Sequence, residues 1–149
     1  MDSHPFGAQF EAHLRSTQQA YVERRSADYL AGFAEHYYSV QLGTEWGEDK
    51  AQLAVKIARD IEGFELLSMD LQVVRLWYSG EIGYGHLSYY TQLLPKGASG
   101  KTSSTVLIDR RENILVGEHI GNGQWRIISK IVVKASNYYD DVADDSPEI

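Results

Sequence analysis

The feature that most constrains this chain is the long segment Glu65–Lys134, in which apolar and polar side chains alternate over several stretches. Alternation with a period of two is typical of β-strands that bury one face and expose the other. Breaks rich in Gly, Ser, Asn or Pro divide the segment. It therefore predicts a meander of four long antiparallel strands, at about 65–78, 81–94, 102–120 and 124–134.

The apolar face of such a sheet needs cover, and the residues before it have the periodicity of helices. We expect a first helix at about 6–26, a short second helix at about 29–37 and a third at about 49–62, which Asp49 begins with the spacing of a capping box. A short strand at about 37–42 precedes the third helix. The prediction is an α+β fold with three N-terminal helices packed on an antiparallel sheet.

Composition bounds the class of protein. The chain has 149 residues, 43% of them hydrophobic and 23% charged, as is usual for one soluble globular domain. We place this domain at 1–134. The remaining segment, 135–149, is rich in Asp and contains no Lys or Arg, so we expect it to be an acidic C-terminal tail.

The sequence also argues against several classes. The absence of cysteine excludes disulfides and thiolate metal sites, and the five histidines show no ligand spacing, so we expect no metal and no cofactor. A net charge of -7 without a basic stripe disfavours nucleic acid. No apolar run approaches the roughly 20 residues of a membrane helix. The N-terminus lacks a signal-peptide pattern, so we expect a cytoplasmic protein.

The hairpin turns predict which side chains share a face of the sheet. If Ser79-Gly80 is the whole loop of the first hairpin, Trp77 is opposite Ile82 and Arg75 is opposite Tyr84. We expect the helices to cover the face that this register defines. It carries Leu67, Met69, Leu71, Val73, Arg75, Trp77, Tyr84, His86 and Tyr90.

The last hairpin leaves two registers open. With Asn122-Gly123 as a two-residue loop, Glu118 lies on the same face as Trp125 and the apolar residues that follow it. A three-residue loop shifts the pairing by one and places His119 there instead of Glu118.

A group of polar side chains on the expected covered face forms the candidate site: Arg75, Tyr84, His86, Tyr90 and Glu118. A carboxylate in apolar surroundings has a raised pKa and can act as a general base. Histidine titrates near neutral pH, and tyrosine hydroxyls can donate to an oxyanion. The structural alternative is an ion pair between Arg75 and Glu118, with the tyrosines packed. The expected pocket walls are Tyr21, Met69, Val73, Trp77 and Trp125.

Two glycines, Gly83 and Gly85, stand inside the second strand of the meander. Glycine weakens a strand unless a bend or a close approach requires it. We interpret them as a sign of sheet curvature, and room for a ligand is the alternative.

The order of elements is itself informative. A helix, a short helix, a short strand, a third helix and a long meander ending in Gly-x-Trp-x-Ile resemble the NTF2-like superfamily, with its SnoaL-like polyketide cyclases and ketosteroid-isomerase-like proteins. The residues that carry the resemblance are Tyr21-Val22, Asp28-Tyr29-Leu30, Gly47 and Gly123–Ile128. The resemblance implies a strongly curved sheet wrapped around a long helix, a cone-shaped, cystatin-like α+β barrel whose mouth is a pocket.

The same resemblance implies a function. We expect a small, largely apolar organic molecule in the cone, bound or converted by a cofactor-free isomerase, cyclase or dehydratase. Glu118 or His86 would be the base, Tyr84 or Tyr90 the oxyanion donor and Arg75 an orienting charge. Many small members carry a histidine where Ser129 and Lys130 stand here, and no aspartate matches the isomerase's catalytic one.

The alternative function is a non-catalytic module for dimerisation or partner binding. The resemblance implies a homodimer through the outer face of the sheet. Ten tyrosines are available for such an interface, because the side chain combines an apolar body with a polar tip.

Overall fold

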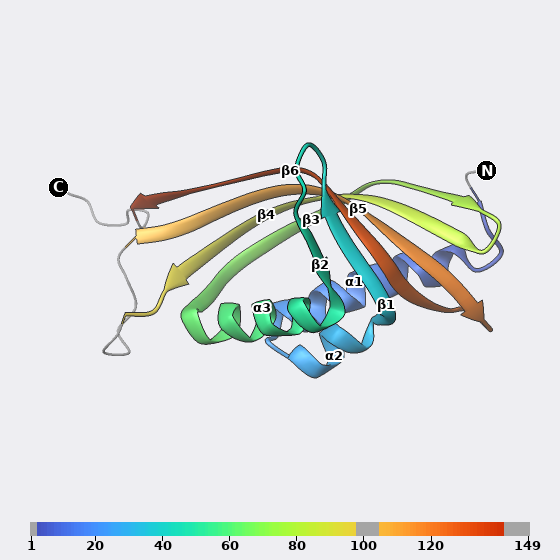
Figure 1. The fold of residues 1–149 in the computed structure, drawn as a ribbon, viewed down its shortest axis with the longest axis horizontal. Coiled ribbons are helices and arrows are strands. Elements are labelled where there is room, and N and C mark those ends of the chain that lie inside the picture. Colours follow the sequence, from blue (N-terminus) through green and yellow to red (C-terminus); the bar gives the residue numbers. More distant parts are fainter. Residues whose placement is uncertain (1–2, 98–104, 142–149) are drawn as a thin grey trace.

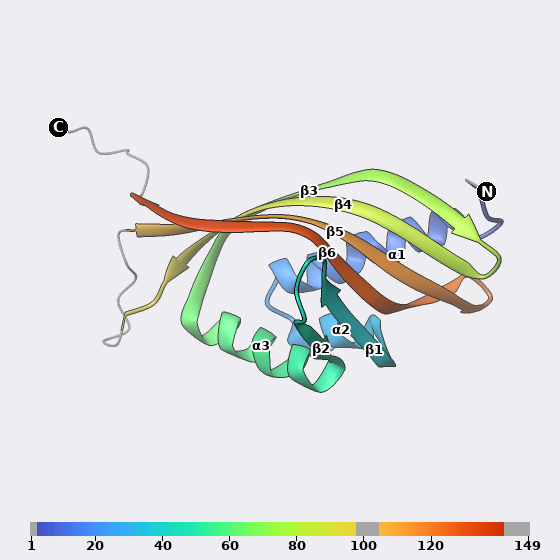
Figure 2. The same cartoon turned by 45° about the horizontal axis from the view of Figure 1, so that its top comes forward.

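The computed structural model describes residues 3–97 and 105–141 and shows three helices and one curved six-stranded sheet that arches over them (Figure 1). The elements are α1 (Gly7–Val22), α2 (Ser26–Ala31), β1 (Phe33–Gln41), β2 (Gly47–Asp49), α3 (Lys50–Gly63), β3 (Phe64–Ser79), β4 (Ile82–Pro95), β5 (Thr105–Gly121) and β6 (Gln124–Asp141). The strand order is β2-β1-β6-β5-β4-β3, and β1 runs parallel to β6 whereas every other pair is antiparallel. We call the face toward the helices the inner face and the opposite one the outer face (Figure 2).

The α+β class and the long meander are confirmed, but the three helices do not form one N-terminal group. α2 ends at Ala31, and the residues expected to continue it form β1, which lies beside β6. β1 and β2 therefore separate α2 from α3. Phe33 and Tyr37 fit a helical period and a strand equally well, and pairing with β6 decides between them.

The start of α3 is as predicted. Asp49 Oδ1 accepts a hydrogen bond of 2.8 Å from the Gln52 backbone N–H, and Gln52 Oε1 accepts one of 2.8 Å from the Asp49 N–H. This reciprocal pair satisfies two backbone donors that a helix start leaves open. Leu53 and Ile57, one turn apart, then bury the apolar side of α3.

The predicted register of the first hairpin is wrong. The loop is Gly80-Glu81, with Ser79 opposite Ile82, and Val74 is an extra residue between Val73 and Arg75 that has no partner on β4. Each bulge of this kind exchanges the faces of all the residues beyond it. Two sets expected on one face are therefore separated: Met69, Leu71 and Val73 lie on the inner face with Leu87 and Tyr89, whereas Arg75, Trp77, Tyr84, His86 and Tyr90 lie on the outer face.

Bulges also set the faces of β5 and β6. Asn122-Gly123 is the loop, but the unpaired Ile120 places His119 opposite Trp125, so His119 is buried and Glu118 is on the outer face. A second unpaired residue, Ile128, turns Lys130 inward. β5 pairs with β4 without a register shift over 109–113, whereas its pairing with β6 shifts between Glu112 and Asn113.

The strand glycines accommodate α1. A Cβ at Gly83 would stand 2.9 Å from Phe10 Cε2, and one at Gly117 would stand 2.5 Å from Phe10 Cε1. At Gly85 it would stand 2.7 Å from Leu14 Cδ1. Close approach of the helix therefore explains the glycines that the sequence analysis attributed to curvature.

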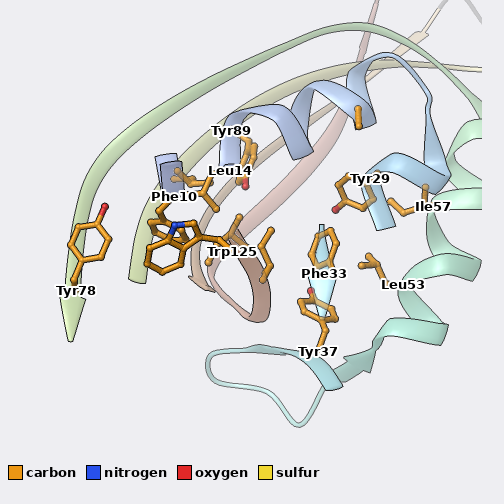
Figure 3. Packing of buried hydrophobic residues seen from close by; sticks show 14 residues of the cluster. Phe10, Leu14, Tyr29, Phe33, Tyr37, Leu53, Ile57, Tyr78, Tyr89 and Trp125 are labelled. Carbon is orange, nitrogen blue, oxygen red and sulfur yellow. The ribbon is translucent and has the colours of Figure 1, made fainter. Parts of the chain in front are cut away.

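The core is one hydrophobic cluster along the inner face, with aromatic residues gathered toward both of its ends (Figure 3). Phe10 and Trp125, with ring centroids 4.7 Å apart, pack near Tyr78 at the start of α1. The group at the other end lies between α2, α3 and β1 and contains Tyr29, Phe33, Tyr37, Leu53 and Ile57.

β6 continues beyond residue 134, and Asp141 pairs with Thr105. The first part of the expected acidic tail, 135–141, is thus a strand, and 142–149 lie outside the described residues, as does the start of the strand expected at 102. None of the described helices combines the length and the apolar character that crossing a bilayer requires.

A polar-floored cavity between the helices and the inner face

A cavity of about 210 Å³ opens between the inner face and the three helices. This volume is below the roughly 300–1,000 Å³ of pockets for drug-sized ligands, so the cavity suits a smaller organic molecule. Most of its wall is apolar or aromatic: Tyr21, Tyr29, Phe33, Leu53, Ile57, Phe64, Met69, Leu93, Leu107 and Leu115.

The floor of the cavity is polar. Asp109, Arg111 and Asn113 alternate along β5, so all three side chains reach the inner face. Arg111 Nε donates a hydrogen bond of 2.9 Å to Asp109 Oδ2. In the part of the chain that the structure describes, Asp109 Oδ1 and Asn113 Oδ1 are buried without a hydrogen-bond partner. A buried acceptor without a partner costs about 1–3 kcal/mol, so both atoms favour a ligand that brings a donor.

Lys130 of β6 completes the floor. It lies between Ser39 of β1 and Leu115 of β5, is 9% exposed and lines the cavity. It makes no ion pair with any carboxylate in residues 3–97 and 105–141. Burial, together with the positive charges of Lys56 and Arg111, lowers the pKa of Lys130 to about 7.

The two other cations at the cavity are paired. Arg111 bonds Asp109, and Lys56 Nζ of α3 lies 3.3 Å from Glu48 Oε1. The remaining acid, Asp60 of α3, has its pKa raised by burial. The cavity therefore holds one amine without a carboxylate partner in the described chain and one carboxyl group, Asp60, whose pKa lies above its ordinary value.

Neutral donors line the same space. Burial raises the pKa of the Tyr29 and Tyr89 hydroxyls, so both remain protonated near neutral pH. Tyr89 is on the inner face of β4, opposite Arg111 of β5. A protonated phenol in such a place can donate a hydrogen bond to a ligand oxygen.

The predicted pocket residues are divided between three places. Tyr21 and Met69 line the cavity. Val73 packs against the core and Trp125 lies within it, near α1. Trp77 is on the outer face, stacked on Tyr84 at 5.3 Å.

The predicted catalytic residues lie on the outer face, outside the cavity, and their roles stay predictions. His86 Nε2 is 3.0 Å from Glu112 Oε1, and the Arg75 guanidinium stands 5.0 Å from the Trp77 ring centroid. Tyr90 lies against Arg110, and Tyr84 against Trp77. Glu118 pairs with Ile82 and Arg126 at the hairpin end.

Sequence reasoning missed Asp109, Arg111, Asn113 and Lys130 as site residues. One signal was present, since Asp109, Arg111 and Asn113 alternate and must share a face of one strand. A lysine inside the apolar run from Ile127 to Val133 was a second. The bulge at Ile128, which directs Lys130 inward, has no signature in the sequence.

One further cluster joins His4, Glu81 and His119 at the hairpin end. His4 Nε2 is 2.9 Å from Glu81 Oε1, and His119 Nδ1 is 2.8 Å from Glu81 Oε2. The other nitrogen of each ring accepts a backbone N–H, from Phe6 and from Gly123 respectively. The nitrogens facing Glu81 therefore carry hydrogen and donate to it, so they have no lone pair for a metal ion. We call this hydrogen-bonded group of His4, Glu81 and His119 the clasp.

Comparison of the sequence with models of known protein families finds no match, and comparison with curated proteins finds none either. Solved structures do match. A ketosteroid isomerase-like protein from Erwinia carotovora atroseptica has a TM-score of 0.67 and 13% identity, over 85% of this chain and 93% of that one. A protein from Shewanella denitrificans that is described as a putative SnoaL-like polyketide cyclase has a TM-score of 0.57 and 10% identity, over 85% of this chain and 89% of that one.

A third neighbour is described as a putative Ca/calmodulin-dependent kinase II association domain, from Exiguobacterium sibiricum, with a TM-score of 0.67 and 9% identity over 89% of this chain and 95% of that one. Further neighbours are described as NTF2-like or as having a cystatin-like fold. At such identities the likeness establishes the fold alone, because one fold supports many functions. The chain has the NTF2-like fold.

Proposed function

We propose that this protein binds a small, largely apolar organic molecule in the cavity, with the ligand's polar group directed at the floor. The observation that carries the proposal is Lys130, a buried amine in a cavity wall without a carboxylate partner in the described chain. Burying an amine is costly, and an apolar side chain would pack there without that cost. A ligand that uses the amine accounts for its presence.

The walls and floor of the cavity favour one class of ligand. Aromatic rings such as Tyr21 and Phe33 favour a ring or an aliphatic body. A carbonyl or carboxylate oxygen would accept from Lys130, and a hydroxyl group would donate to the free oxygens of Asp109 and Asn113.

The catalytic form of the proposal is cofactor-free acid–base chemistry, namely isomerisation, cyclisation or dehydration through an enolate-like intermediate. The base would be a group that lines the cavity, with Lys130 first because its pKa is near neutral. The Tyr89 hydroxyl would stabilise the enolate oxygen. Glu118 and His86, the bases predicted from the sequence, lie on the outer face and outside this cavity.

Ligand-dependent unfolding tests the binding. We expect single-ring alcohols, ketones and carboxylates to raise the Tm, because a ligand that binds only the native state stabilises it. Leu107→Trp, which fills the cavity, should abolish the shift, and Leu67→Trp at an exposed position should not. A panel without any shift, or an equal loss in both variants, would contradict the proposal.

A second candidate function is self-association through the outer face. Trp77 and Tyr84 stack there, and Val74 of the same strand as Trp77 is 55% exposed. Sedimentation of the wild type should show a dimer that Val74→Lys weakens, whereas Val55→Lys on α3 leaves it intact. A monomer at all concentrations would exclude the homodimer.

A further inference from the structure

We propose that the Lys130 amine condenses with a carbonyl group of the bound molecule to form an imine, so that the ligands of this site are small aldehydes or ketones with an apolar body. This inference rests on the proposed function, since it requires that the molecule enter the same cavity. It adds a covalent step and a narrower ligand class.

The first support is the place of Lys130 in the sheet. A row of paired residues crosses the inner face from Glu48 through Ser39 and Lys130 to Leu115. The direct neighbours of Lys130 in this row are thus a hydroxyl and an aliphatic side chain, and burial with the cations Lys56 and Arg111 outweighs the opposite effect of the carboxylates of Glu48 and Asp109 on its pKa. The charge-free form of the amine is favoured in such surroundings.

The second support is a contrast with the other described lysines. Lys50 Nζ is 2.7 Å from Glu35, Lys56 is 3.3 Å from Glu48, and Lys134 is 3.6 Å from Glu112. Lys96 donates to the Ile61 carbonyl at 3.2 Å. Three of these lysines thus lie in ion pairs and Lys96 is exposed, whereas Lys130 is buried without a carboxylate partner in the described chain, which is a setting that suits a nucleophilic amine.

The step balances without an oxidant or a reductant. The Lys130 nitrogen lone pair attacks the carbonyl carbon and forms a C–N bond, and a proton moves from nitrogen to oxygen to give a carbinolamine. An acid then donates a proton to the carbinolamine hydroxyl, the C–O bond breaks and water leaves, and the second nitrogen proton returns to the conjugate base of that acid. The products are the imine and one water molecule.

The cavity contains groups for the proton transfers. Burial raises the pKa of Asp60, so this carboxyl can supply a proton to the leaving oxygen nearer to neutral pH than an exposed aspartate could. The free Asn113 Oδ1 can accept from the carbinolamine hydroxyl and hold it in place. Both residues line the same cavity as Lys130.

Reductive trapping tests the inference on the full chain. The protein is treated with benzaldehyde or formaldehyde and cyanoborohydride from pH 6 to 10, and the modified lysines are located by peptide mass spectrometry. We expect benzaldehyde to label Lys130 at least tenfold faster than Lys134 at pH 7.5, with a rate that levels off above about pH 7. Lys130→Arg and Lys130→Met should lose this label, and Lys134→Met should keep it.

A parallel measurement separates the inference from the proposed function. Benzyl alcohol has the same ring but cannot form an imine, so its effect on the Tm reports binding alone. A Tm shift with benzyl alcohol, but labelling of Lys130 no faster than that of Lys134, overturns the imine and leaves the binding site. Labelling of Lys130 by formaldehyde alone also overturns it, because the amine is then reactive without accepting an apolar carbonyl compound. No Tm shift and no label contradict both proposals.

Discussion

Arg111 donates a hydrogen bond of 2.9 Å from Nε to Oδ2 of Asp109, and this pair forms the paired half of a cavity floor whose other cation, Lys130, has no carboxylate partner in the described chain. We therefore expect Arg111 to stabilise the folded protein and Lys130 to destabilise it. Removal of Arg111 leaves a carboxylate with only 18% of its side chain exposed, whereas removal of Lys130 leaves no charge behind.

Arg111→Met should therefore destabilise the protein, by roughly 1–3 kcal/mol, because Asp109 loses its partner where water reaches it poorly. Urea unfolding measures the loss. The double variant Arg111→Met with Asp109→Asn should regain part of it. Arg15→Met, at an exposed pair with Glu11, is the control and should change stability by no more than about 0.5 kcal/mol.

Lys130→Met should stabilise the protein at pH 6 and lose this advantage by pH 10. The folded-state pKa of about 7 lies below the ordinary value, so the unfolded chain binds more protons between those two values and wild-type stability rises with pH across that window. Below about pH 7 the amine is charged in both states, so the wild type bears the full cost of burying this charge, on the order of a few kcal/mol. Unfolding free energies at pH 6, 8 and 10 measure the difference between the wild type and the variant.

The matched control is Lys134→Met, which removes an exposed lysine whose Nζ lies 3.6 Å from Glu112 Oε2. Its stability should stay parallel to that of the wild type across the same pH values. Parallel curves for Lys130→Met would show that the buried amine stays protonated, and would remove the basis of its proposed reactivity.

The fold could be predicted further than the site. The capping box at Asp49, the alternation of β4 and the Gly-x-Trp end of the meander are local signals, and each places its element correctly. The face on which a side chain lies is harder to predict. It depends on whether the number of residues between the turn and that side chain is odd or even. The unpaired residues Val74, Ile120 and Ile128 each change this number by one and so move the following side chains to the other face.

These unpaired residues explain why the candidate site predicted from the sequence lies on the outer face and not on the covered face. Arg75, Tyr84 and His86 do lie together, as the alternation predicted, but on the outer face. The inner face of β5 holds the polar residues of the cavity, and the bulge at Ile128 brings Lys130 to them. Bulges arise from packing across the sheet, which no local pattern records.

Gly117→Ala should destabilise the protein by roughly 1–3 kcal/mol, because the added methyl group would stand 2.5 Å from Phe10 Cε1 and force the ring or α1 to move. Thermal unfolding measures the effect. Phe10→Leu in the same chain should recover part of the loss by removing the ring atoms. Gly63→Ala, where a Cβ meets no atom within 4 Å, is the matched control and should be close to neutral.

Glu81→Gln should lower the Tm at neutral pH and converge with the wild type in acid. Hydrogen bonds from His119 and His4 lower the pKa of Glu81 below its ordinary value. A group whose folded pKa is lowered stabilises the native state above its unfolded pKa, and this contribution disappears as the pH falls through the folded value. Tm measurements between pH 3 and 7 should show the gap closing below the ordinary glutamate range. Glu62→Gln, at an exposed position on α3, is the control, and a gap for Glu81→Gln that persists unchanged to pH 3 would mean that the clasp does not depend on the carboxylate charge.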